Sequence, residues 1–139
     1  MKNYNLKFKI LPHIADLKIQ VYGRTKEELF ENAMIGMQSA LRAKVKSQKS
    51  KVKTLKIKSI DLNSLLVDFL SEINYLNEVN KEVYSDIKFT KFSDKELEGK
   101  ISGNKVGSFG LIIKGITYHE LDIHQEKNGT WQATVLFDI

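Results

Sequence analysis

The segment from Trp131 to Ile139 alternates its side chains in a strand-like pattern up to the final residue. One face would carry Trp131, Ala133, Val135 and Phe137, and the other Gln132, Thr134, Leu136 and Asp138. Because chain ends usually fray, a period of two that persists this far predicts a strand held in a sheet to its end. That strand would bring the side-chain carboxylate of Asp138 and the terminal carboxylate of Ile139 to one place.

Carboxylates held close together repel each other unless positive charge lies between them. A hard cation such as Ca²⁺ or Mg²⁺ would supply it, since such cations prefer oxygen ligands. A lysine of this chain or a basic group of a partner would serve as well. The pattern at the chain end leaves these three options open.

Length and composition indicate one globular domain spanning residues 1–139. The chain has 139 residues, of which 42% are hydrophobic and 28% charged, and this matches a common domain size. No window approaches the ~20 apolar residues of a membrane span, and the first five residues lack the apolar run of a signal peptide. We therefore expect a cytoplasmic protein with no membrane partner. The absence of cysteine excludes disulfides, thiolate zinc sites and thiol catalysis.

The pattern along the chain predicts an α+β fold. Alternation predicts strands over residues 6–10 and 17–21, the second ending at Gly23, and another within the lysine-rich segment around Leu55 and Ile57. Thr25 and Glu28 form a capping box before one amphipathic helix, and Asp61 can cap a second. Further strands are expected at 87–91, 97–102, 111–123 and 130–139, with Asn128-Gly129 as the turn between the last two.

The resulting fold prediction is a mostly antiparallel β-sheet packed with two amphipathic helices. The glycine-rich segment 103–110 around Lys105 does not match a phosphate-binding loop, because no helix pattern follows it. We interpret it as a mobile loop.

The net charge of +5 is concentrated in one segment. From Arg42 to Lys58 there are eight basic residues and no acidic one, so the remainder of the chain is net acidic. Such a segment can follow a phosphate backbone, but it contains no aromatic residue that could stack on bases. The solvated face of a strand explains it better.

Three charged side chains are candidates for a functional site. Asp68 and Glu72 are four residues apart in the second predicted helix, so they share one face, although a solvated helix edge would give the same spacing. Lys114 is the only charged residue between Leu111 and Tyr118; it would seek an anion, or reach solvent from a sheet edge. The histidines, including His119, lack the spacing of a zinc site, and no Gly-x-Ser-x-Gly motif marks a serine hydrolase.

Four stretches together resemble the archease family. They are His13-Ile14-Ala15-Asp16 with the following Gly23 to Ala33, then Leu65 to Glu72, then Lys114-Gly115-Ile116-Thr117-Tyr118-His119, and the ending Phe137-Asp138-Ile139. The similarity covers nearly the whole chain, and the order and spacing of the stretches make it specific.

The resemblance implies an accessory protein rather than an enzyme. It implies that the chain activates a GTP-dependent RNA ligase of the RtcB type, used in tRNA splicing and RNA repair, by promoting guanylylation of the ligase and its repeated turnover. It also implies a divalent-metal site at Asp16, Asp138 and the carboxylate of Ile139, with calcium as the usual ion and Mg²⁺ and Mn²⁺ as alternatives. By the same resemblance Lys114 is needed for activation, and Asp68, Glu72 and His119 belong to the same motifs.

Two other function classes remain open at this stage. A chaperone-like modulator of RNA-modifying enzymes would bind through apolar surface and would be indifferent to Asp138 or metal. A plain RNA-binding module would use the segment from Arg42 to Lys58, and its affinity would fall steeply with salt.

Overall fold

The computed structural model describes residues 6–11 and 16–139, and it confirms the α+β prediction. In chain order the elements are β1 (Phe8–Leu11), β2 (Asp16–Gly23), α1 (Lys26–Ala40), β3 (Lys44–Lys49), β4 (Lys53–Lys58), α2 (Leu62–Asn80), β5 (Glu82–Phe92), β6 (Glu96–Ser108), β7 (Gly115–Gln125) and β8 (Trp131–Asp138). In the described part of the chain, neither helix has the length and apolar character needed to cross a bilayer.

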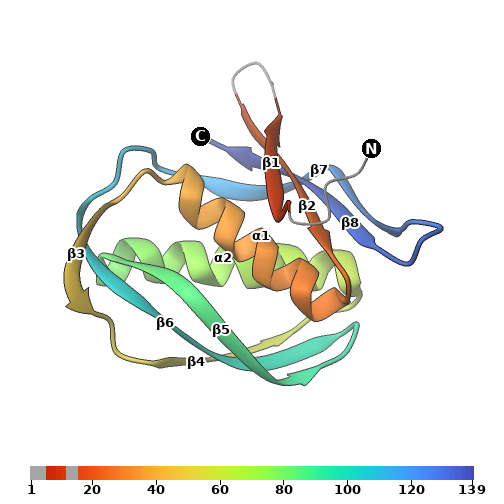
Figure 1. Cartoon of the computed structure of the whole chain (residues 1–139), viewed down its shortest axis with the longest axis horizontal. Helices are drawn as coiled ribbons and strands as arrows, with labels where there is room; N and C mark the ends of the chain where they lie inside the picture. Colours follow the sequence, from red (N-terminus) through yellow and green to blue (C-terminus); the bar gives the residue numbers. More distant parts are fainter. Residues whose placement is uncertain (1–5, 12–15) are drawn as a thin grey trace.

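The two helices lie between two antiparallel sheets (Figure 1). The first sheet has the strand order β1-β2-β8-β7. In the second sheet the long strand β6 pairs with β5 along one edge, while β3 and β4 pair with different parts of β6 along the other. Each helix is covered by sheet on two sides and therefore buries apolar residues on more than one face. The apolar core lies between the helices and both sheets.

The predicted helix starts are confirmed in detail. At α1 the Glu28 amide donates to Thr25 Oγ1 at 3.1 Å, and the Arg24 amide donates to Glu28 Oε1 at 3.1 Å. At α2 the Ser64 amide donates to Asp61 Oδ1 at 2.7 Å, and this hydrogen bond lowers the pKa of Asp61. Both caps satisfy amides that would otherwise lack a partner within the helix.

The predicted mobile loop at 103–110 is wrong, because β6 continues to Ser108. Gly103 lies inside this strand, opposite an irregularity of β5 between Tyr84 and Asp86. A Cβ atom at Gly103 would lie 1.9 Å from the Val83 carbonyl oxygen, so glycine is required there by close approach of two backbones. The sequence analysis also missed β3, whose six residues are all exposed.

A buried carboxylate joins three strands of the second sheet. Glu82 is only 1% exposed and lies 2.6 Å from Lys53 Nζ and 2.8 Å from Lys105 Nζ; the Tyr84 hydroxyl donates to it at 2.9 Å. Burial acts to raise the pKa of Glu82, but the hydrogen bonds from Lys105, Lys53 and Tyr84 outweigh burial and lower it. The ionised carboxylate therefore stabilises the fold.

We expect the Glu82→Gln substitution to lower the free energy of unfolding by about 2 kcal/mol at neutral pH, because two lysines would lose their counter-ion. Since the pKa of Glu82 is lower in the folded than in the unfolded state, its stabilisation is present above pH ~4.5 and is lost as the pH falls further. Urea unfolding between pH 3 and 7 measures both effects. A variant with the acid sensitivity of wild type would contradict this role.

We expect the Gly103→Ala substitution to destabilise the protein by about 2–4 kcal/mol, because the new methyl group would collide with the Val83 carbonyl. Gly107→Ala is the matched control in the same strand, since its Cβ would make only ordinary contacts, with the flexible Lys46 side chain at 3.6 Å and the Lys44 carbonyl oxygen at 3.9 Å. Thermal unfolding of the two variants compares them, and equal melting temperatures would refute the explanation.

Candidate functional site

The first residue of β2 and the last residue of β8 lie directly opposite each other. Asp16 and Asp138 are register partners in this antiparallel pair, so their side chains project from the same face with Cβ atoms about 4.5–5.5 Å apart. Asp138 is exposed and Asp16 is half-buried. Two like charges placed this way are destabilising unless positive charge lies near them.

Lys114 lies beside the same pair, on the other side of β8. Its backbone amide donates to the Asp138 carbonyl oxygen at 2.7 Å, and the next residue, Gly115, is the register partner of Asp138 in β7. The structure thus brings together Asp16, Lys114 and Asp138, with the half-buried Ile139 following. Of the predicted motif around Asp16, His13 to Ala15 lie outside the described residues.

The segment before Lys114 is fixed to the body of the protein at three points. The amides of Gly110 and Leu111 both donate to the Leu41 carbonyl, at 2.9 and 3.1 Å. On α2, Asn74 Nδ2 donates to the Ile113 carbonyl at 3.0 Å, and the Ile113 side chain is buried. Helix α2 therefore positions the backbone from which Lys114 projects.

His119 lies in a large bulge of β7. Thr117 pairs with Leu136 and Asp122 with Thr134, so four residues of β7 lie opposite one residue of β8. The His119 side chain is exposed, and its amide donates to Thr117 Oγ1 at 3.3 Å. The regular strand expected for residues 111–123 is wrong here, since neither glycine nor proline marks the bulge in the sequence.

Asp68 and Glu72 lie on α2, as predicted, but they differ in environment. Asp68 is exposed and accepts a hydrogen bond of 2.6 Å from Ser59 Oγ, just after β4. This contact ties Asp68 to the side of the second sheet, whereas Asp16 and Asp138 belong to the first. Glu72 is half-buried on the same helix.

The sequence analysis missed a carboxylate–histidine group on β7. His124 Nδ1 lies 2.6 Å from Asp122 Oδ2, and His124 Nε2 lies 3.1 Å from Glu126 Oε1. The hydrogen bonds to Glu126 and Asp122 raise the pKa of His124, which favours the imidazolium form. The signal that could have revealed it is the Asp-x-His-x-Glu spacing, since a period of two places the three side chains on one face.

The Asp16–Asp138 pair fits part of a site for a hard cation. Ca²⁺ takes six to eight oxygen ligands, and these side chains offer only oxygen. Within residues 6–11 and 16–139, no three His, Asp or Glu side chains gather closely enough to hold an ion by themselves. A cation here would therefore depend on the two aspartates, the Ile139 carboxylate and several waters, and the donor set does not suit zinc.

Comparison with known proteins identifies the family. Residues 8–139 match the model of the "Archease protein family (MTH1598/TM1083)". The chain is 35% identical to the protein archease of Methanosarcina barkeri, with all of both chains covered. It is 33% identical to that of Pyrococcus furiosus, covering 91% of this chain and 94% of the relative.

The chain belongs to the archease family. Its fold is similar to the solution structure of Methanobacterium thermoautotrophicum protein 1598, with a TM-score of 0.74, 25% identity and 95% of this chain and 98% of that chain covered. It is also similar to the crystal structure of a Thermotoga maritima archease described as a possible chaperone. For that structure the TM-score is 0.69 at 20% identity, with 99% and 100% of the two chains covered.

We expect the Asn74→Ala substitution in this archease-family chain to loosen the segment before Lys114, because the buried Ile113 carbonyl would lose its donor. The cost should be about 1–3 kcal/mol, and hydrogen exchange of the Lys114 amide should accelerate. Ser71→Ala, at an exposed position of the same helix, is the control. Unchanged exchange at Lys114 in the Asn74 variant would refute this positioning role.

Proposed function

We propose that this chain is a non-enzymatic, cytoplasmic activator of a GTP-dependent RNA ligase of the RtcB type, promoting ligase guanylylation and multiple turnover in tRNA splicing or RNA repair. The family supplies the class of protein. The observation that supports an activating site is the register pair of Asp16 and Asp138, with the Lys114 amide bonded to Asp138.

The proposed chemistry follows from the charges at this site. Asp16, Asp138 and the Ile139 carboxylate would hold a divalent cation, with Ca²⁺ the first candidate and Mg²⁺ or Mn²⁺ the alternatives. When bound, such a cation supplies Lewis acidity toward phosphate oxygens. Asp138 is exposed, so it can reach a partner's active site, while the exposed Lys114 ammonium can contact triphosphate or an acidic group of the ligase.

The remaining candidates would act as contacts around this centre. His119 projects from the β7 bulge, which leaves it accessible to a partner surface. Asp68 and Glu72 would present carboxylates from α2. We propose that these three residues orient the ligase rather than hold the cation, since Asp68 is tied to Ser59 on the side of the second sheet.

We expect the Asp138→Asn substitution to reduce ligase guanylylation more than tenfold in a reconstituted mixture of ligase, GTP and this protein. The substitution keeps the size of the side chain and the backbone bond to Lys114 while removing charge. Asp86→Asn, at an exposed position of β5, is the control for loss of a surface carboxylate. Lys114→Met should also abolish activation, with Lys127→Met as its control. Full activation by the Asp138 variant would refute the proposed role.

A chaperone-like role is the second candidate, favoured by exposed apolar side chains close in sequence to the site residues. Ile112 and Tyr118 flank the segment from Lys114 to Thr117, and Tyr75 and Val79 lie on the outer side of α2. Such side chains often mark surfaces for protein partners. This role predicts partner stabilisation that survives both chelation and the Asp138→Asn substitution, so the same experiment separates the two functions.

The RNA-binding option is weakened by the structure. In the basic segment Lys53 already pairs with Glu82 at 2.6 Å, and Lys58 lies 3.8 Å from Glu96. Both lysines therefore offer less charge to a phosphate backbone than the sequence suggested.

A further inference from the structure

A groove of about 540 Å³ runs beside the C-terminal half of α1, between the ends of β3 and β5. We call it the α1 groove and define it by the side chains that the argument uses, namely Lys7, Ile35, Arg42, Val45, Val83 and Ser85. Its volume lies within the range of specific ligand sites. It uses none of the residues assigned above to ligase activation.

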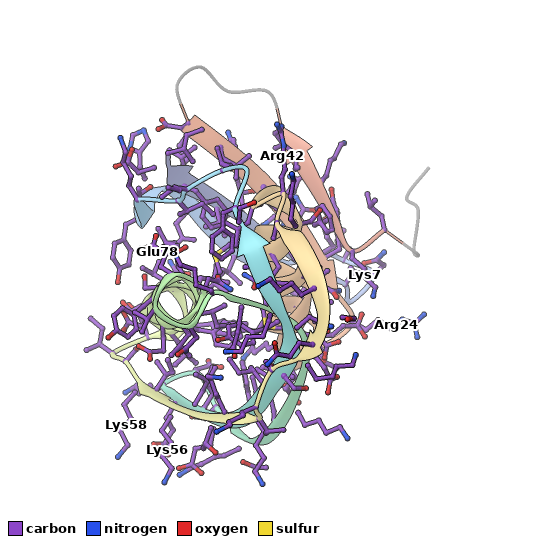
Figure 2. The ribbon with its side chains drawn as sticks, turned by 90° about the vertical axis from the view of Figure 1, so that its left-hand side faces the viewer. Lys7, Arg24, Arg42, Lys56, Lys58 and Glu78 are labelled. Carbon is purple, nitrogen blue, oxygen red and sulfur yellow. The ribbon has the colours of Figure 1, made fainter. Side chains whose placement is uncertain are left out.

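The charge around the α1 groove is positive. Arg42 and Lys7 line it, and among the described lining residues there is no carboxylate; Glu31, outside the lining, interacts electrostatically with Lys7. Figure 2 shows this side of the molecule, with Arg42 where α1 gives way to β3. The exposed lysines of β3, Lys44, Lys46 and Lys49, extend the positive surface beyond the groove. An occupant should therefore be anionic.

The floor of the α1 groove is apolar. Val45 is the only apolar residue of β3, and it is 58% exposed. Ile35 of α1 and Val83 of β5 line the same groove and are half-buried. An occupant that covers Val45 would bury apolar surface from three separate elements, and burial of apolar area favours association.

A stacked RNA base and a small polar ligand both fit this lining poorly. Tyr84 is the only aromatic residue of the lining and is 1% exposed, so its ring face is not available for stacking. The two amide side chains of the lining are already engaged. Gln38 Oε1 accepts from Asn77 Nδ2 at 2.6 Å and from the Tyr84 amide at 2.9 Å, while Asn104 Nδ2 donates to the Lys46 carbonyl at 3.1 Å. The remaining lining consists of the Arg42 and Lys7 side chains, the exposed Ser39 and Ser85 hydroxyls, and apolar surface.

The backbone at Arg42 determines how its side chain can be tested. Arg42 follows α1 with φ at 48°, in the left-handed region where glycine is favoured. Lys81 ends α2 in the same conformation, with φ at 54°, so this conformation serves to end a helix. Gly110 packs against Arg42 so closely that an added Cβ would lie 2.9 Å from Arg42 Cβ.

We infer that the α1 groove binds a short acidic segment of a partner protein, whose carboxylates pair with Arg42 and Lys7 and whose apolar side chains cover Val45, Ile35 and Val83. Arginine suits carboxylates because its fork of donors matches them geometrically. The inference does not depend on the proposed ligase activation.

The test begins with a phage-displayed library of random short peptides, selected on the full chain. The strongest peptide is then synthesised with a fluorescent label, and its affinity is measured by fluorescence anisotropy. We expect selected sequences to combine Asp or Glu with Leu, Ile or Phe. We expect binding to weaken at least tenfold with Arg42→Gly and with Val45→Ser.

The choice of Arg42→Gly separates binding from folding. Glycine is favoured at a positive φ, so this variant should melt at the same or a higher temperature while losing the peptide. Lys56→Gln and Val52→Ser are the controls, since both residues are exposed on or beside β4 and neither lines the groove.

Three outcomes would overturn the inference. They are failure to enrich any acidic peptide, selected peptides that bind the Arg42→Gly and Val45→Ser variants as tightly as the wild type, and displacement of the peptide by oligouridylate at equal concentration. The last outcome would assign the groove to RNA. Because the readout contains no ligase, failure here leaves the Asp138 experiment unaffected.

Discussion

The pairing of β2 with β8 is the interaction on which the candidate site depends. These strands meet in continuous register from Asp16 opposite Asp138 to Gly23 opposite Trp131. Buried residues of both strands, among them Ile19, Val21, Ala133 and Val135, join the core that covers α1. A shift of one residue would turn these side chains to the opposite face, so the core itself fixes the position of Asp16 opposite Asp138. Burial of these core residues, several positions along the strands, therefore holds the acidic pair in place.

Sequence reasoning predicted those parts of the fold that have a local signal. Thr25 and Asp61 start helices through contacts within three residues, and Asn128-Gly129 forms the predicted turn, with Gly129 at a φ of 90°. The grouping of Asp16 with Asp138 was expected from the resemblance to the archease family, whereas alternation alone indicated only that Asp138 lies at the end of a strand. Confirmation of the grouping in register required knowing which strands pair, which a single sequence does not reveal.

The features that the sequence did not predict arise from contacts between distant segments. From the sequence alone Gly103 resembles a loop residue, and only its close approach to the Val83 carbonyl explains why glycine is needed. Strand β3 lacks a buried face, so its alternation carried no usable signal. The sequence also did not reveal the ion pair of Lys53, because its partner Glu82 lies far along the chain. In each case the residue that determines the structure lies in another strand. The strand propensity of a segment carries no information about such a partner.

The bulge of β7 has a further consequence for the side chains that it displays. Register with β8 is intact at Thr117 and is restored at Asp122, so the residues between them are released from the demands of sheet pairing. Lys18 of β2 pairs with Glu120 of the bulge at 3.2 Å, and Leu121 packs against the core, so the bulge is anchored at its far end. Its first half, Tyr118 and His119, is exposed, and the bulge thereby displays two side chains that a regular strand would have placed on opposite faces of the sheet.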